Sequence, residues 1–199
     1  MKSKSSIKNI ELLQSIKKER TLVLIKPDGV ERKLVGEIIS RFEKVNLRIV
    51  GLGIVIADKN KFDKHYPKDK KWIENLGNNF IITCQENNID FDLKDLGVKN
   101  LYELGIKVRE WLINYMASGP IVKIVLEGNN AVEIVRKIVG HTLPQKAQPG
   151  TIRGDFSIDS PIVANLEKRA LKNLIHASSN KKEADKEIKL WFNKKELID

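Results

Sequence analysis

Hydrophobic and polar positions in the first third of the chain predict two strands and two helices. The apolar run TLVLIK at 21–26 has the character of a buried strand, and the Pro-Asp-Gly sequence after it is a strong turn signal. Apolar residues then recur at helical spacing over 33–45, which predicts an amphipathic helix. The Val- and Ile-rich stretch 48–57 predicts a long strand, and Asp58 is expected to cap a helix that ends near Tyr66.

The middle of the chain is less regular. From 67 to about 105, asparagine, lysine and aspartate are frequent and apolar anchors are few, which predicts an insertion of short helices. A helix over 107–117 and a strand over 121–126 follow. An asparagine at 129 or 130 is expected to cap the next helix, whose inner face consists of Val132, Val135 and Val139.

The last third begins with a loop over 140–154 that is rich in proline and glycine. A helical pattern over 157–172, a strand over 173–175 and a helix over 184–192 follow. With the insertions left out, the predicted order is β-α-β-α-α-β-α-loop-β-α. This alternation is typical of a small α+β domain whose antiparallel sheet carries helices on one face.

Length and composition suit one domain with insertions, because the chain has 199 residues of which 41% are hydrophobic. No apolar run reaches the roughly 18 residues of a membrane helix, so we expect no membrane partner. The stretch 1–20 is rich in lysine and serine, with apolar residues at helical spacing, and predicts a short amphipathic helix rather than a secretory signal. The single cysteine, Cys84, excludes an internal disulfide and favours a reducing, cytoplasmic location.

The net charge of +10 invites a nucleic-acid hypothesis. The lysines are spread over the whole chain, and there is no aromatic RNA-binding motif or Cys/His finger, so nucleic acid is not the expected partner. Most of the charge is interpreted as solvated surface that also attracts polyphosphates. The three histidines (His65, His141 and His176) are far apart in the sequence and form no His-x-x-x-His pair, so no metal site is expected in the chain itself.

His176 is the strongest candidate for chemistry. It follows a short apolar strand, and a helix that starts near Asn180 would bring Glu187 back to the ring, orient it and select its tautomer. Two further clusters, at 25–29 and 149–155, add lysine, arginine and glycine. A lone histidine beside a strand is more often structural. An imidazole surrounded by cations, however, suggests transfer of an anionic group, and phosphoryl is the leading candidate.

Motifs of other nucleotide enzymes are missing. The chain has no Gly-x-x-x-x-Gly-Lys-Ser/Thr loop, which argues against a P-loop kinase. The Gly-Leu-Gly sequence at 51–53 lacks the third glycine of a dinucleotide fingerprint, and there is no Gly-x-Ser-x-Gly elbow.

These clusters, in this order, resemble the nucleoside diphosphate kinase family. The matching stretches lie at 19–30, 34–39, 65–66, 115–120, 127–128, 149–156, 173–176 and 187–192. The resemblance implies an α+β fold with a ferredoxin-like βαββαβ sandwich, an antiparallel sheet and helical insertions. It divides the chain into an N-terminal extension (1–18) and a kinase-like domain (19–199) with insertions at about 67–105 and 157–170.

The resemblance also implies an activity and a set of partners. The family passes the γ-phosphate of a nucleoside triphosphate to a nucleoside diphosphate by a ping-pong mechanism through a phosphohistidine. Partners would be nucleoside triphosphates, nucleoside diphosphates and further copies of the chain in a homo-oligomer. Mg²⁺ is expected to arrive with the nucleotide.

Residue by residue, the resemblance carries roles onto this chain. His176 would be the nucleophile, and Glu187 and Ser178 match the pair that holds its imidazole in place. Lys26 and Tyr66 match residues that contact the transferring phosphate.

Nucleotide-binding roles carry over in the same way. Arg136, Thr142 and Arg153 match the residues that clamp the phosphates, and a guanidinium suits non-bridging oxygens. Asn173 matches the residue that bonds the sugar hydroxyl.

Simpler interpretations stay open for several of these residues. Lys26 could be an ordinary strand-end lysine and Arg136 a solvated helix residue. Tyr66 could be a core aromatic, and Ser178 could merely cap the last helix. The alternative function is a catalytically silent nucleotide-binding or regulatory protein on the same fold.

The chain also departs from the family pattern. Ala177 stands where the family usually has glycine, and Val108 stands where it has the phenylalanine that stacks on the base. The insertion at 67–105 is interpreted either as a surface lobe or as a lid over the base. As a lid, it would bring Trp72 or Tyr102 to the base and accept purines and pyrimidines alike.

Overall fold

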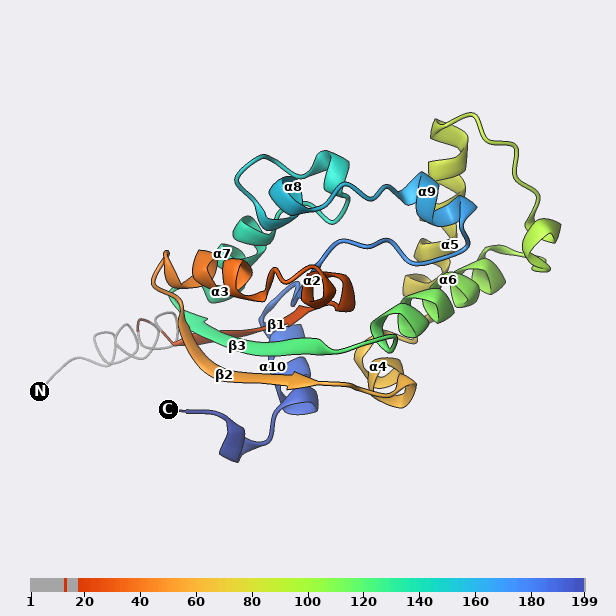
Figure 1. Ribbon diagram of the computed structural model, residues 1–199. Helices are drawn as coiled ribbons and strands as arrows, with labels where there is room; N and C mark the ends of the chain where they lie inside the picture. The colour runs from red at the N-terminus through yellow and green to blue at the C-terminus, as the bar shows by residue number, and fades with distance from the viewer. Residues whose placement is uncertain (1–12, 14–17, 199) are drawn as a thin grey trace, which may run out of the picture.

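A four-stranded antiparallel sheet forms the centre of the molecule (Figure 1). The computed structural model describes residue 13 and residues 18–198. The strands β1 (Glu19–Ile25), β2 (Arg48–Val55), β3 (Ile121–Gly128) and β4 (Ile175–Ala177) lie in the order β2-β3-β1-β4. All three strand pairs are antiparallel, and a bulge interrupts β2 between Ile49 and Gly51. The predicted α+β fold with an antiparallel sheet is confirmed.

The helices predicted around 33–45, 58–66, 107–117, 130–139 and 184–192 are present with adjusted ends, whereas α2 and α8 form where a turn and a loop were predicted. Their bounds are α2 (Pro27–Glu31), α3 (Val35–Glu43), α4 (Lys59–His65), α5 (Lys70–Glu86), α6 (Leu101–Met116), α7 (Ala131–Val139), α8 (Ile152–Phe156), α9 (Pro161–Leu166) and α10 (Lys181–Trp191), with short 3₁₀ turns η1 (Leu93–Leu96), η2 (Pro144–Lys146) and η3 (Lys194–Glu196). Asp58 caps α4 as predicted, since its carboxylate accepts from the Lys61 amide at 2.8 Å. Asn130 precedes α7 in the left-handed region and makes no side-chain cap.

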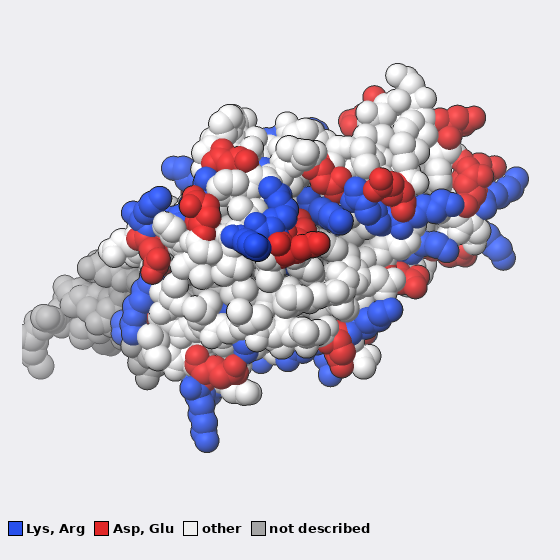
Figure 2. Space-filling view, in the orientation of Figure 1, with Lys and Arg blue, Asp and Glu red and all other residues white. Residues whose placement is uncertain are grey.

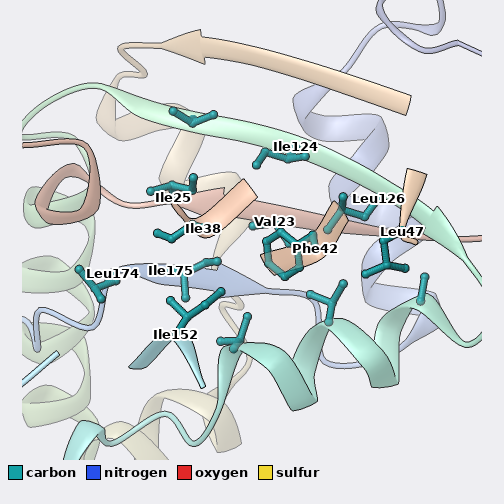
Figure 3. Packing of buried hydrophobic residues seen from close by; sticks show 14 residues of the cluster. Val23, Ile25, Ile38, Phe42, Leu47, Ile124, Leu126, Ile152, Leu174 and Ile175 are labelled. Carbon is teal, nitrogen blue, oxygen red and sulfur yellow. The ribbon is translucent and has the colours of Figure 1, made fainter. Parts of the chain in front are cut away.

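One face of the sheet packs against α3, α7 and α8 (Figure 3). The strands contribute alternate residues, among them Val23 and Ile25 of β1 and Ile124 of β3. Phe42 of α3 fills the space between the strands and the helices. Leu174, just before β4, is part of the same buried cluster.

The opposite face of the sheet is covered as well, by α4, α6 and α10. Leu22 and Leu24 of β1 pack there against Phe62, Met116 and Trp191. The expectation of helices on one face was therefore wrong. The reason is visible in β1, whose residues 21–25 are all fully buried, as a strand between two helical layers requires.

The stretch 67–105 forms a long helical hairpin with α6 rather than short helices. Helix α5 has 17 residues, and α6 begins at Leu101, six residues before the predicted start at 107. The two helices cross in close contact: a Cβ built on Gly105 would lie 1.9 Å from the Ile73 carbonyl oxygen, and one on Gly77 would lie 2.2 Å from that of Leu101. A separate apolar cluster around Phe80 fills the hairpin.

The stretch 157–172 is mostly irregular and contains only the six-residue helix α9. Arg169 holds it together by pairing with both carboxylate oxygens of Asp159, at 2.6 and 2.9 Å. The Asn165 amide approaches the Phe80 carbonyl oxygen at 3.4 Å, so this stretch contacts α5. Figure 1 shows α9 beside α5. The two predicted insertions therefore meet in space.

Charge is mixed on the surface. On the face shown in Figure 2, Lys and Arg side chains alternate with Asp and Glu and do not form one continuous basic area. Among the described residues, no helix is long and apolar enough to cross a membrane. The amphipathic helix predicted within 1–20 falls almost wholly outside the described residues, of which this stretch contributes only Leu13 and 18–20.

Candidate functional site

A cavity of about 680 Å³ brings together seven of the nine residues selected from the sequence. Its wall includes Lys26, Tyr66, Arg136, Thr142, Arg153, Asn173 and His176. The other two, Ser178 and Glu187, are buried behind the His176 ring. Residues from β4, α7, α8 and α10, from the positions just after β1 and α4, and from the loops are thus gathered at one place.

Within the described residues, His176 is held through one ring nitrogen, Nε2. It lies in β4 opposite Leu24, and its Nε2 is 2.9 and 3.1 Å from the two carboxylate oxygens of Glu187. An ionised Glu187 selects the tautomer with the proton on Nε2, which leaves the lone pair on Nδ1. Burial and the charge of Lys26 lower the pKa of His176, so the ring is neutral at pH 7. A neutral imidazole with a free Nδ1 is a competent nucleophile.

Glu187 is fixed from several sides. The Ser178 hydroxyl donates to its Oε2, which shows that Ser178 does more than cap α10. Burial raises the pKa of Glu187, although the hydrogen bond from Ser178 favours its charged form. Because carboxylate and imidazole are both held, the orientation of the ring is set before any ligand binds.

His65 is a neighbour that the sequence reasoning did not select as a site residue. Its ring lies edge-on to that of His176, with the centroids 4.6 Å apart. Trp191 Nε1–H donates to His65 Nδ1 at 3.2 Å, so this nitrogen is an acceptor and the proton is on Nε2. The 3.3 Å between His65 Nδ1 and Glu187 is then a close approach rather than a hydrogen bond. The sequence feature that could have identified His65 is its place beside Tyr66 in the stretch 65–66, which matches the family.

His65, His176 and Glu187 also form the one group of potential metal ligands found among the described residues, with ligand atoms within 4.8 Å of one another. His65 and His176, far apart in the sequence, are thus neighbours in the fold. The hydrogen bonds just described already occupy these atoms. Lys26 and Arg153 lower the pKa of His176 and would likewise oppose a dication, so we assign no metal here.

Lys26 is not an ordinary strand-end lysine. It is only 6% exposed, and its Nζ donates to Asn173 Oδ1 at 2.6 Å. Burial, followed by the charge of Arg153, lowers its pKa to about 7, whereas Asp28 opposes that shift. An anionic phosphate beside Lys26 would favour its charged form.

Arg153, which was expected to bind phosphates, makes most of its hydrogen bonds to the protein backbone. Its guanidinium donates to the carbonyl oxygens of Asn173, Gly140 and Ile175, at 3.2, 3.0 and 2.6 Å. Three of its five N–H groups are thus used, and two remain for a ligand. Burial and the charge of Arg136 lower its pKa to about 10, so it stays charged at pH 7.

Asn173 and Arg136 differ in the number of hydrogen bonds that their side chains make within the protein. The Asn173 side chain is buried, accepts from Lys26 and donates to the Thr142 carbonyl oxygen at 2.8 Å. Arg136 is exposed on α7 and has no hydrogen-bond partner within the part of the chain that the structure describes. Its guanidinium is therefore available to an anion in the cavity.

Tyr66 combines both interpretations that the sequence left open. Its ring belongs to the apolar cluster under the sheet and stacks on Trp72, while its side chain also lines the cavity. Burial and Glu187 raise its pKa, so its hydroxyl stays protonated and can donate. Ala177 also lines the cavity, and its φ is not positive, so its methyl group causes no backbone strain.

The far end of the cavity is mainly apolar. Its lining side chains come from α5, α6 and the stretch 157–172, and include Leu76, Phe80, Val108, Trp111, Leu112 and Leu171. Neither Trp72 nor Tyr102 lines the cavity, so the expected position of these two aromatics was wrong. Trp72 packs on Tyr66, and Tyr102 is partly exposed on α6.

Comparison with known sequences identifies the family. The family model described as "Nucleoside diphosphate kinase" matches residues 19–78 and 98–197. The nucleoside diphosphate kinase of Pyrobaculum aerophilum is 49% identical over 181 residues, which cover 91% of this chain and 98% of that protein.

Solved structures agree with the sequence match. The crystal structure of an NDP kinase from Pyrobaculum aerophilum superimposes with a TM-score of 0.88 at 46% identity, covering 92% of this chain and all of that one. A transition-state mimic of the nucleoside-diphosphate kinase from Borrelia burgdorferi, with bound vanadate and ADP, gives a TM-score of 0.70 at 33% identity and covers 90% of each chain. With the sheet, the cavity and these matches in agreement, the chain belongs to the nucleoside diphosphate kinase family of phosphotransferases.

Proposed function

We propose that His176 carries the phosphoryl group in ping-pong transfer from nucleoside triphosphates to nucleoside diphosphates. The observation behind this is the imidazole held at Nε2 by Glu187, with Nδ1 free at a cavity lined by Lys26, Arg136 and Arg153. Nδ1 attacks the γ-phosphorus, and an N–P bond forms as the bond to the β-bridging oxygen breaks. The electron pair leaves with the nucleoside diphosphate, and a second diphosphate reverses the step.

Charge on the transferring group is stabilised by the cavity wall. Lys26 and the Tyr66 hydroxyl donate to its equatorial oxygens, and Arg136 and Arg153 bind the remaining phosphates. Glu187 stabilises the positive charge that develops on the ring when Nδ1 forms its bond. The burial of Lys26 and Arg153 keeps their interactions strong, because solvent screens buried charges less than exposed ones.

Magnesium would enter this site with the nucleotide. Among the described residues that line the cavity, the one carboxylate is that of Glu86 on α5, among the residues of the apolar end. Mg²⁺ prefers oxygen ligands and retains water, so phosphate oxygens and water would supply its coordination. Bound in this way, the ion would neutralise phosphate charge.

The base would occupy the apolar end of the cavity. The cationic wall takes the phosphates, so the opposite wall of Phe80, Trp111 and Leu171 is left for the base. Aromatic and aliphatic surfaces accept any base, because each base has a π face. Broad use of purine and pyrimidine nucleotides therefore stays our expectation, with Trp111 in place of Trp72 or Tyr102.

A homo-oligomer would use the outer edge of β2. This strand ends the sheet, and the side chains of Leu52, Ile54 and, just after the strand, Ile56 are 53%, 72% and 75% exposed. An exposed apolar strand edge is a surface that another chain can cover.

Cys84 is buried as a free thiol, which supports the expected cytoplasmic location.

Labelled nucleotide tests the function directly. Incubation with γ-labelled ATP should yield an acid-labile phosphoprotein that added GDP or CDP discharges, and His176→Ala should abolish labelling without unfolding the chain. Label on His65 or His141 would contradict the assignment. Nucleotide binding without any label would favour the catalytically silent alternative.

A further inference from the structure

A strained turn lies directly before the nucleophile. The Ile175 amide donates to the Asn173 carbonyl oxygen at 2.8 Å, which closes a three-residue γ-turn around Leu174. Leu174 has a φ of +68°, and a γ-turn of this hand is the rare and strained form. Its side chain is fully buried in the core (Figure 3), so glycine could not replace it without loss of packing.

Both backbone groups of Leu174 have specific partners. Its amide donates to Asp28 Oδ2 at 3.1 Å, and its carbonyl oxygen accepts from the Lys26 amide at 2.8 Å. Such contacts can hold a residue in a conformation that it would not adopt alone. The segment that presents Asn173 and His176 is thereby fastened to the end of β1.

Asp28 is itself fixed, and from a distant element. Its Oδ1 accepts from the Gly29 amide at 3.0 Å and from the hydroxyl of Tyr115 at 2.5 Å. Tyr115 belongs to α6, so the carboxylate links three parts of the chain. Asp28 is 7% exposed, and it favours the charged forms of both Lys26 and Arg153.

We propose that Asp28, oriented by Tyr115, is a positioning residue that keeps the strained turn at Leu174 closed and so aims His176 into the cavity. This inference rests on the function proposed above. Asp28 does not line the cavity and would not touch the nucleotide. An error of 1 Å in the position of a reacting group can slow a reaction about a hundredfold.

The test separates positioning from binding. In Asp28→Asn the side chain keeps its size but has only one acceptor oxygen, so either Leu174 N–H or Gly29 N–H would face an NH₂ group. We expect the single-turnover rate constant for His176 phosphorylation at saturating ATP to fall by about tenfold to a hundredfold. The Kd of a non-hydrolysable ATP analogue should stay equal or become tighter, because a negative charge beside the phosphate site is removed.

Two further variants complete the experiment. Tyr115→Phe removes only the hydroxyl, and its rate constant should fall less than that of Asp28→Asn. Glu127→Gln is the matched control, since Glu127 is also a buried carboxylate but pairs with Arg20 away from the cavity. Its rate constant should equal that of the wild type.

Three results would overturn the proposal. An unchanged rate constant in Asp28→Asn would do so directly. A smaller labelled fraction with an unchanged rate constant would mean that Asp28 supports folding only. A wild-type chain that takes no label on His176 would instead contradict the proposed function and remove the basis for both.

Discussion

The imidazole of His65 lies edge-on to that of His176, with 4.6 Å between the ring centroids. One comes from the end of α4 and the other from β4, and both approach Glu187 of α10. His65 does not line the cavity, and its Nδ1 accepts from Trp191. Its Nε2 has no hydrogen-bond partner in the described part of the chain. His65 is thus a packed, neutral support behind the proposed nucleophile.

Replacing His65 by phenylalanine keeps a ring in this position but removes the acceptor for Trp191. We expect the free energy of unfolding to fall by about 1–3 kcal/mol, because the buried Trp191 N–H loses its partner. Urea unfolding measures this change. Labelling of His176 should continue, and its complete loss would show that His65 takes part in transfer.

Glu187→Gln tests the carboxylate that orients the nucleophile. The amide can turn its NH₂ group to His176, which would favour the tautomer with the proton on Nδ1 and block attack. We expect the phosphorylation rate constant to fall roughly 10²-fold or more. Asp185→Asn, an exposed position on the same helix, should change the rate less than about twofold. Equal effects in the two variants would contradict this role.

Lys26→Met should abolish phosphoryl transfer and raise the stability of the fold. Burial holds the pKa of Lys26 at about 7, below its ordinary value of 10.5, so folding at pH 7 opposes its charged form. We expect the free energy of unfolding at pH 7 to rise by roughly 1–3 kcal/mol, and phosphoryl transfer to be lost.

The pH dependence of this effect has a definite sign. Between about pH 7 and 10.5 the unfolded chain binds a proton at Lys26 that the folded chain does not. The free energy of unfolding of the wild type therefore rises relative to that of Lys26→Met as the pH rises through this window. The stability advantage of the variant is largest at pH 7 and below. Denaturant unfolding at pH 7, 8 and 9 measures it, and a difference independent of pH would refute the buried-lysine explanation.

Gly105→Ala tests the hairpin that forms the apolar end of the cavity. A methyl group at 1.9 Å from the Ile73 carbonyl oxygen must push α5 and α6 apart. We expect lower stability and a higher KM for ATP, GTP and CTP alike, with a smaller effect on kcat. Gly36→Ala is the control, since a Cβ there has open space and should stabilise α3 by roughly 0.5–1 kcal/mol. Unchanged KM values would place the base elsewhere.

Ile54→Glu tests the edge of β2 as an assembly surface. Ile54 is 72% exposed, so a charge there should leave the fold intact and prevent a second chain from covering the edge. We expect light scattering to show an oligomer for the wild type and a smaller species for the variant. Ile158→Glu, fully exposed in the stretch 157–172, should assemble like the wild type. A monomeric wild type at micromolar concentration would overturn the proposed oligomer.

Local sequence determined the elements of the fold. The run TLVLIK specifies a strand because it is apolar throughout, and Asp58 specifies a helix start because its carboxylate can accept from a nearby amide. The stretches around Lys26, Arg153 and His176 likewise identified the residues that share the cavity. These signals could be recognised because each depends on neighbours in the chain.

Only the tertiary structure decided what depends on distant partners. No local pattern places His65 against His176, turns Arg153 towards backbone carbonyls, or puts Trp111 in the cavity instead of Trp72. Nor does the sequence show that Asp28 holds Leu174 at positive φ, because that hydrogen bond joins the two ends of the domain. Periodicity shows which side of an element is buried, whereas the neighbour it meets there follows from the packing of the whole chain.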